Sequence, residues 1–215
     1  MNKNLKDFEN EYWAKMDQGI CFRHKTAFEL IDKGLVLDLG CGDGLFLKML
    51  KNKGIKGIGI EVSEVAIEKA RAKELDIKKF DFTINKLPFP DNFFETVVLL
   101  DVLEHLYQPK KVLKEVHRVS RNLLISVPNF NSLPARIQML LGKIPENNKH
   151  RQGHIYWMSY SIIKDLLKES LFSIEEMKVN SFFSWVPVIK NLMQFLAKIK
   201  PSIFALNFVI KARKS

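Results

Sequence analysis

Glycines and carboxylates lie close together after an apolar segment near the start of the chain. Residues 36–44 read VLDLGCGDG, in which Asp38 and Asp43 accompany three glycines. A buried strand that breaks into glycines and then starts a helix lets a ligand approach the backbone, with N–H groups and the positive helix end directed at it. Glu61 ends the next apolar segment, where a carboxylate suits the hydroxyl groups of a ribose. The pattern predicts a site for a nucleoside-containing cofactor.

The spacing and charge of this loop distinguish two cofactors. A dinucleotide-binding loop reads G-x-G-x-x-G. Here Gly40, Gly42 and Gly44 are spaced differently, and Leu45 stands where the third dinucleotide glycine would fall. Carboxylates beside the loop would repel a pyrophosphate, whereas they would attract the ammonium and sulfonium groups of S-adenosylmethionine. The sequence therefore favours S-adenosylmethionine over NAD.

Histidines are the natural candidates for a general base, which methyl transfer needs only when the acceptor must lose a proton. His105 follows Asp101 closely, and His154 begins the segment HIYWMSYS. We take both as candidate catalytic residues, with a packing role as the alternative for His105. Glu104 and His105 are neighbours, so on a helix they would point about 100° apart and would not form a facing pair.

No metal site is expected from the sequence. His150 and His154 are four residues apart, a spacing that suits metal ligands on a helix. Gly153 and the polar residues around it predict a loop instead.

Several of these segments resemble a known family. Three stretches match motifs I, II and IV of the class I S-adenosylmethionine-dependent methyltransferases in order: VLDLGCGDG, GIGIEVSEVAIEKA and LPFPDNFFETVVLLDVLEHL. Two later stretches, ISVPNF and PARIQMLLGKIP, are similar to the methionine-biosynthesis protein family MetW within methyltransferase type 11. The resemblance implies S-adenosylmethionine as cofactor, S-adenosylhomocysteine as product and few catalytic side chains.

The resemblance also implies which residues contact the cofactor. They are Tyr12, Arg23, Asp38, Gly40, Cys41, Gly42, Gly44, Leu45, Glu61, Val62, Thr83, Ile84, Asp101 and Val102. Asp38 would contact the ammonium group, and Glu61 would accept both ribose hydroxyls. The alternative for Asp38 is a carboxylate that caps the glycine turn, and the alternative for Glu61 is a surface residue at a strand end. Asp101 and Val102 would lie near the methionine end.

Adenine recognition departs from the family pattern. Many members carry Gly-Asp-Ala before the L-P-F-x-D segment, whereas this chain has Phe82, Thr83 and Ile84 there, and Asp81 is two places early. Thr83 would then hydrogen-bond the adenine and Ile84 would stack on it.

The elements that must position these residues alternate between strand and helix. This order predicts a parallel sheet covered on both faces. The family resemblance makes it a Rossmann-like three-layer α/β/α sandwich with seven mostly parallel strands, the last one antiparallel. The predicted strands are 35–39, 57–61, 78–83, 96–100, 123–127, 172–179 and 205–212, and the predicted helices are 5–16, 20–31, 45–52, 63–73, one from Pro109, 134–141, 159–171 and 185–199.

The composition fits one domain. The chain has 215 residues, of which 47% are hydrophobic. We expect a single domain over 1–215, with an N-terminal helical cap (1–33), a cofactor-binding half (34–128) and a substrate-side half with helical insertions (129–215). No stretch of eighteen apolar residues and no apolar signal segment is found, so a cytoplasmic location is expected. Two cysteines do not suggest a disulfide framework.

Positive charge is concentrated at the end of the chain. The formal net charge is +10, and residues 181–215 contain no Asp or Glu. Residues 185–199 also carry an amphipathic pattern of Trp185, Ile189, Leu192, Leu196 and Ile199. Packing of this stripe as part of the core or of a lid is the favoured interpretation, and peripheral contact with a membrane is the alternative. Nucleic acid is an unlikely partner because no recognition module is visible.

Three functions follow from these features. The first is an enzyme that methylates a small-molecule acceptor. The second is a MetW-like protein that binds the cofactor but works mainly as a partner of homoserine O-acyltransferase, as the resemblance implies. The third is a methyltransferase of RNA or of a lipid-like acceptor, suggested by the basic C-terminal segment.

Overall fold

The protein is built around one seven-stranded sheet. The computed structural model describes residues 5–15, 19–145, 153–182 and 186–215. The strands follow the order β3-β2-β1-β4-β5-β7-β6, and β7 is antiparallel to both of its neighbours while the other pairs are parallel. The bounds are β1 Val36–Leu39, β2 Gly57–Glu61, β3 Ile77–Lys79, β4 Phe94–Leu100, β5 Ser120–Pro128, β6 Phe172–Ser181 and β7 Ala205–Lys214. The predicted Rossmann-like architecture with an antiparallel last strand is confirmed.

Helices connect most of these strands. They are α1 Leu5–Lys15, α2 Phe22–Glu29, α3 Leu45–Asn52, α4 Glu64–Arg71, the 3-10 helix η1 Leu103–His105, α5 Pro109–Val119, α6 Leu133–Leu140, α7 Tyr160–Glu169, α8 Pro187–Ile199 and α9 Pro201–Phe204. Two helices begin with the residues that the sequence predicted for their N-termini. The Ser63 hydroxyl caps α4 by accepting the Ala66 N–H at 3.3 Å, and Pro109 occupies the first turn of α5.

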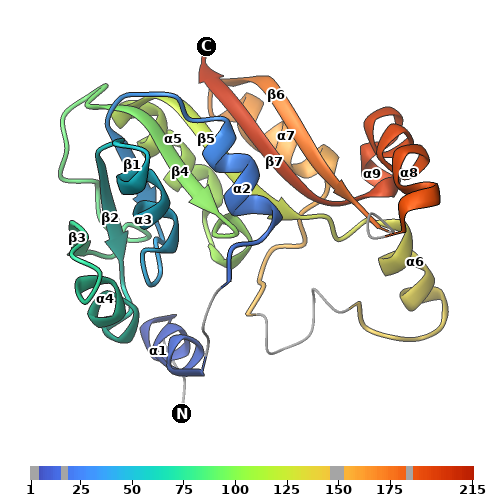
Figure 1. Cartoon of the computed structure of the whole chain (residues 1–215), viewed down its shortest axis with the longest axis horizontal. Coiled ribbons are helices and arrows are strands. Elements are labelled where there is room, and N and C mark those ends of the chain that lie inside the picture. The colour runs from blue at the N-terminus through green and yellow to red at the C-terminus, as the bar shows by residue number, and fades with distance from the viewer. Residues whose placement is uncertain (1–4, 16–18, 146–152, 183–185) are drawn as a thin grey trace.

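Alternating side chains on the central strands produce two separate cores. Val97 and Leu99 of β4 belong to one buried cluster together with side chains of α5 and α7. Val98, between them, belongs to a second cluster together with side chains of α2 and α3. Because successive strand residues point to opposite faces, this division requires helices on both sides of the sheet. Figure 1 shows the resulting three layers.

The carboxyl ends of the parallel strands meet at one edge of the sheet. The chain order reverses between β1 and β4, which pair in parallel with Val36 opposite Thr96. Ligands of open α/β sheets bind in the crevice at such a switch point. The loops after β1, β2 and β4 leave the sheet at this edge, so the fold brings Gly40, Glu61 and Asp101 together.

Two predicted elements differ from the structure. The third strand was expected to continue to Thr83, but β3 ends at Lys79. The Asp81 carboxylate accepts the Thr83 N–H at 2.9 Å, and a side chain that bonds the backbone two residues on closes a turn instead of extending a strand.

The second difference concerns α8, for which packing in the core or in a lid was the favoured interpretation. Ala197 is buried, but Leu192 and Ile199 are exposed and Ile189 and Leu196 are only half-buried. The observed exposure argues against the core alternative. Trp185 lies outside the described residues, as does His150. None of the helices described is long and apolar enough to cross a membrane.

Candidate functional site

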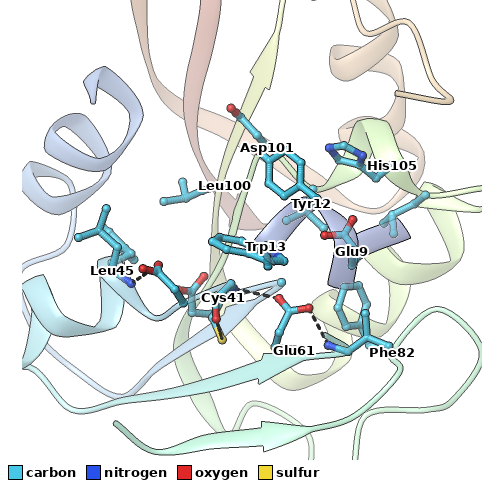
Figure 2. A pocket seen from close by; sticks show the side chains of 18 of the residues that line it. Glu9, Tyr12, Trp13, Cys41, Leu45, Glu61, Phe82, Leu100, Asp101 and His105 are labelled. Carbon is cyan, nitrogen blue, oxygen red and sulfur yellow. Dashed lines mark hydrogen bonds between the residues drawn. The ribbon is translucent and has the colours of Figure 1, made fainter. Parts of the chain in front are cut away.

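A cavity of about 270 Å³ opens at the carboxyl edge of the sheet. Its walls come from α1, α2, the loops after β1 to β4, the end of β5 and the segment that follows residue 152. Figure 2 shows Glu9, Tyr12 and Trp13 of α1 facing the same space as Glu61 and Asp101. Residues far apart in the sequence therefore form one site.

Glu61 is held by the backbone around it. Its Oε2 accepts the Gly42 N–H at 2.9 Å, and its Oε1 accepts the N–H groups of Val62 at 2.7 Å and Ser63 at 2.9 Å. Burial raises the pKa of this carboxyl, and the three N–H groups oppose that shift. A carboxylate offers about four acceptor positions, so Oε2 retains one for a ligand. Glu61 lines the cavity and so has capacity for one ribose hydroxyl directly.

The two loop carboxylates differ in their surroundings. Asp43 is bonded to Lys73, whose Nζ lies 2.6 Å from Oδ2, so its charge is offset. Asp38 is buried in the cavity wall, and burial together with the charge of Glu61 raises its pKa to about 8. A carboxyl in this setting ionises readily only when a cation approaches it. The cation preference predicted for the loop therefore depends on Asp38 more than on Asp43.

Helix α1 covers the cavity from one side. Trp13 is buried, and a Cβ placed on Gly42 would lie 2.1 Å from its indole ring. Gly42 also has φ of 53°, a conformation that favours glycine. A side chain at this position is therefore disfavoured both by the clash with Trp13 and by the backbone conformation. The Trp13 side chain hydrogen-bonds Glu9, whose pKa rises to about 7 because of burial and the nearby charge of Glu61.

The opposite wall begins at Asp101, directly after β4. Its carboxylate pairs with Arg23, whose Nη1 lies 3.1 Å from Oδ2, and it accepts a hydrogen bond from the Ser126 hydroxyl. Asp101 has φ of 55°, a strained conformation for a residue other than glycine. Arg23 thus contacts Asp101 and also lines the cavity, so its contact with the cofactor stays a prediction.

Histidines lie beside Asp101 at the end of the cavity. His105 and His154 both line it, with ring centroids 4.9 Å apart. Burial and the charge of His154 lower the pKa of His105 to about 4, so its ring is neutral at pH 7. Glu104, next to His105, is fully buried, and its burial and Asp101 raise its pKa well above the usual range. The structure thus brings together two histidines that are 49 residues apart in sequence.

Most of the predicted cofactor residues reach this cavity. Those that line it are Tyr12, Arg23, Asp38, Gly40, Cys41, Gly42, Leu45, Glu61, Val62, Thr83, Asp101 and Val102. Gly44 does not line it. It begins α3 with φ of 76°, and a Cβ there would lie 2.4 Å from Leu75. Its role is therefore in the backbone turn.

The adenine residues need a correction. Ile84 is 70% exposed and lies outside the cavity, because the turn closed by Asp81 directs the chain away from the site. Phe80 and Phe82 line the cavity instead. Thr83 lines it as well, but its hydroxyl donates to Asp81 at 2.6 Å and so retains only acceptor capacity.

Several lining residues were not predicted. Glu9 is the most informative, because it lies three and four residues before Tyr12 and Trp13 and hence on the same face of α1. That spacing was visible in the sequence. The sequence did not show that this face of α1 lines the cavity, because that depends on how the helix packs.

Known proteins similar to this chain include methyltransferases and methionine-biosynthesis proteins. A probable S-adenosylmethionine-dependent methyltransferase of Mycobacterium tuberculosis is 29% identical over 126 residues, which are 57% of this chain and 44% of that protein. The bifunctional methionine biosynthesis protein MetXA/MetW of Rhodopirellula baltica is 26% identical over 140 residues, 60% of this chain and 22% of that protein. The chain therefore spans less than half the length of these two relatives.

Solved structures agree with the fold. The crystal structure of magnesium protoporphyrin IX methyltransferase from Synechocystis, with bound SAH, superposes with a TM-score of 0.69 at 18% identity, covering 98% of each chain. The fold is thus that of the class I methyltransferases, as the motif resemblance predicted. A family model described as "Methionine biosynthesis protein MetW" matches residues 23–178. Because that match covers more than half of the chain, the protein belongs to the MetW family.

Proposed function

We propose that this protein is an S-adenosylmethionine-dependent methyltransferase that acts on a small-molecule acceptor. The observation that carries the proposal is the cavity at the switch point of the sheet, where Glu61 is fixed by three backbone N–H groups and Asp38 is buried nearby. The similarity to a probable S-adenosylmethionine-dependent methyltransferase supports the same cofactor.

The residues present fit such a cofactor. Glu61 would hold the ribose, Asp38 would bind the ammonium group, and Phe82 would lie against the adenine ring. Of the carboxylates that line the cavity, Asp43 is paired with Lys73 and Asp101 with Arg23. The others that could attract a cation are Glu9, Asp38, Glu61 and Asp81. When bound, S-adenosylmethionine supplies a methyl group that is already activated by its sulfonium.

The acceptor would enter between Asp101 and the two histidines. Aligning two reactants can lower a barrier by about 7–11 kcal/mol, so the walls of this end of the cavity would provide most of the catalysis. His105 is neutral at pH 7 and could accept a proton from the acceptor. His154 lines the same end and is the second candidate base.

Calorimetric titration of the purified protein tests the proposal. S-adenosylhomocysteine and S-adenosylmethionine should each bind at one site per chain, and NAD should not. Glu61→Gln should weaken S-adenosylhomocysteine binding by roughly 10- to 100-fold, since the amide loses acceptor capacity and places an N–H against backbone donors. Glu68→Gln, an exposed glutamate of α4, is the matched control and should bind normally.

Two results would contradict the proposal. One is the absence of any heat with either sulfur compound while the protein is folded. The other is equal affinity in Glu61→Gln and the wild-type protein.

A second candidate function is a partner of homoserine O-acyltransferase in methionine synthesis. Two observations favour it: the membership in the MetW family, and the relative whose name combines MetXA with MetW in one chain. The exposed apolar side chains of α8, among them Val188, Leu192 and Phe195, offer a surface for such a partner.

A further inference from the structure

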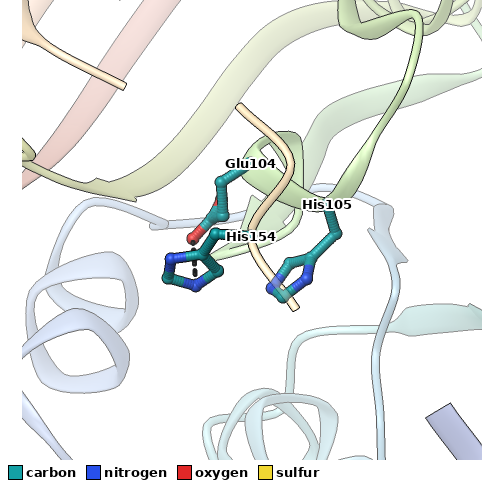
Figure 3. Close-up of side chains that lie close together, drawn as sticks. All are labelled: Glu104, His105 and His154. Atoms are coloured by element: carbon teal, nitrogen blue, oxygen red, sulfur yellow. Dashed lines mark ion pairs between the residues drawn. The ribbon is translucent and has the colours of Figure 1, made fainter. Parts of the chain in front are cut away.

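Three side chains with metal-ligand chemistry meet beside the cavity. Glu104, His105 and His154 each direct one ligand atom into a space where these atoms lie within 4.8 Å of one another (Figure 3). The backbone explains why His154 reaches η1. The Glu104 carbonyl accepts the N–H groups of Ile155 at 2.8 Å and Tyr156 at 2.9 Å, which fixes the segment that carries His154.

Glu104 has no adequate partner among the described residues. Its side chain is 0% exposed, and neither carboxyl oxygen accepts a hydrogen bond within that part of the chain. The Nε2 of His154 lies 3.9 Å from Oε1, which is too long for a hydrogen bond. Buried polar groups are normally satisfied, and an unsatisfied carboxyl is costly. The orphaned oxygens therefore indicate a missing ligand.

His105 is already oriented as a metal ligand would be. Its Nδ1 lies 3.2 Å from the carbonyl oxygen of Gly153. A carbonyl oxygen can only accept, so this contact keeps the proton on Nδ1 and leaves the lone pair on Nε2. Metal-binding histidines usually donate their second N–H to such a carbonyl or to a carboxylate.

We propose that Glu104, His105 and His154 bind a divalent first-row transition-metal ion at the acceptor end of the cavity. Two imidazoles and one carboxylate suit Zn²⁺ or Fe²⁺ better than Mg²⁺, which prefers oxygen ligands. Two ligands at about 2.1 Å from one ion lie at most about 4.2 Å apart. Ligand atoms within 4.8 Å of one another thus need only small side-chain rotations.

The surrounding charges permit a cation at this place. Asp101 acts electrostatically on both Glu104 and His105. Arg23 also acts on Glu104, but its guanidinium pairs with Asp101 at 3.1 Å, so its positive charge is largely offset. The sequence predicted no metal site, because His154 was considered there only as a metal ligand together with His150. This proposal differs from that prediction.

The site also specifies the acceptor, an inference that rests on the proposed function. His105 and His154 line the cavity, so a metal held there would have open positions toward the acceptor. An oxygen atom of the acceptor, such as a phenol or another hydroxyl, would bind to it. A metal lowers the pKa of a bound hydroxyl, which would release its proton to water without a strong protein base.

Direct metal binding to tag-free, chelator-treated protein tests this proposal. Titration with Zn²⁺, monitored by calorimetry, and with Co²⁺, monitored by visible absorption, should reveal one site per chain. Glu104→Gln and His154→Ala should each weaken binding at least tenfold. His117→Gln, a half-buried histidine of α5, is the matched control and should bind as the wild type does. Mg²⁺ should bind more weakly than Zn²⁺.

A second control addresses another possible zinc ligand pair. The Sγ of Cys21 lies 3.3 Å from Nδ1 of His24, so Cys21→Ala should retain the metal. Loss of binding only in Cys21→Ala, equal binding in Glu104→Gln and His154→Ala, or no binding by the folded wild type would each overturn the proposal. S-adenosylhomocysteine is titrated separately. Its binding without metal binding would refute this inference alone, and the reverse would refute the proposed function.

Discussion

Buried carboxyl groups dominate the chemistry of this site at the scale of single residues. Asp38 and Glu9 have pKa values raised to about 8 and about 7, and burial is the largest cause in both. The nearby negative charge of Glu61 makes Asp38 harder to ionise. A bound cation would favour the ionised forms of the Asp38 and Glu9 carboxyl groups, so the cavity favours a positively charged ligand. This is a physical reason for preferring a sulfonium cofactor with a free ammonium group.

Asp38 makes stability depend on pH in a defined direction. From about pH 4 to about pH 8 the folded protein keeps a proton on Asp38 that the unfolded chain has lost. The free energy of unfolding of the cofactor-free protein should therefore fall as pH rises through this range and should level off above it. Asp38→Asn removes this contribution, so it should be more stable than the wild type at pH 8 and similar to it at pH 4.

Urea unfolding at the two pH values measures this effect, with Asp32→Asn as an exposed control. The same variant should bind S-adenosylhomocysteine roughly 10- to 100-fold more weakly at pH 8, because a charge-assisted hydrogen bond contributes about 1.5–3 kcal/mol. A parallel pH profile for Asp38→Asn and the wild type would show that Asp38 does not carry the raised pKa.

Helix α1 is the element on which the closed cavity depends. It is attached to α4 by the Ser63 hydroxyl, which donates to Asn10 at 2.7 Å, and by Lys69, which donates to the Trp13 carbonyl at 2.6 Å. Trp13 then packs on Gly42. The periodicity of residues 5–16 predicted the helix correctly, but only packing revealed that its apolar and acidic face forms a wall of the site.

Trp13→Ala tests this role of α1. Removing the buried indole should lower the unfolding free energy by up to about 3–5 kcal/mol, less if α1 detaches without disturbing the sheet. S-adenosylhomocysteine should bind roughly tenfold more weakly, as measured by calorimetry, because one cavity wall is lost. Lys15→Ala, an exposed position of the same helix, should leave both quantities unchanged. Wild-type affinity in Trp13→Ala would mean that α1 does not shape the cofactor site.

The whole molecule combines an acidic cavity with a basic and partly apolar C-terminal region. The net charge is +10, yet Glu9, Asp38, Glu61 and Asp101 all line the cavity. On α8, Val188 is 91% and Phe195 is 59% exposed. Isolated exposed apolar residues are common, but several on one helix are typical of an interaction surface.

Phe195→Glu tests the partner function at this scale. If homoserine O-acyltransferase binds α8, this variant should lose co-purification with that enzyme while it binds S-adenosylhomocysteine normally. Gln194→Glu, an exposed neighbour on the same helix, supplies the same charge and should retain the partner. Retention by both variants would exclude α8 as the docking surface. Binding of both to anionic vesicles in place of the enzyme would favour the membrane alternative.

The sequence by itself determined most of the sheet and the end of the cavity that the glycine loop forms. Strand alternation, glycine spacing and the ends of apolar segments are local patterns, so β2 and α3 were predicted with their observed bounds. The places of Glu61 and Asp38 in the cavity wall follow from the same patterns, because ligands of open α/β sheets bind in the crevice outside the carboxyl ends of the strands.

Only the tertiary structure decided the end of the cavity that holds the histidines and the wall that α1 forms. His154 meets Glu104 and His105 because two backbone hydrogen bonds attach its segment to η1 across about fifty residues of sequence. Glu9 and Trp13 reach the cavity because α1 packs against α4. Such contacts depend on which surfaces meet after folding, and no local spacing encodes them. Ile84 lies outside the cavity for the same reason, since the turn closed by the Asp81 side chain places Phe82 and Thr83 in the cavity wall and leaves Ile84 exposed.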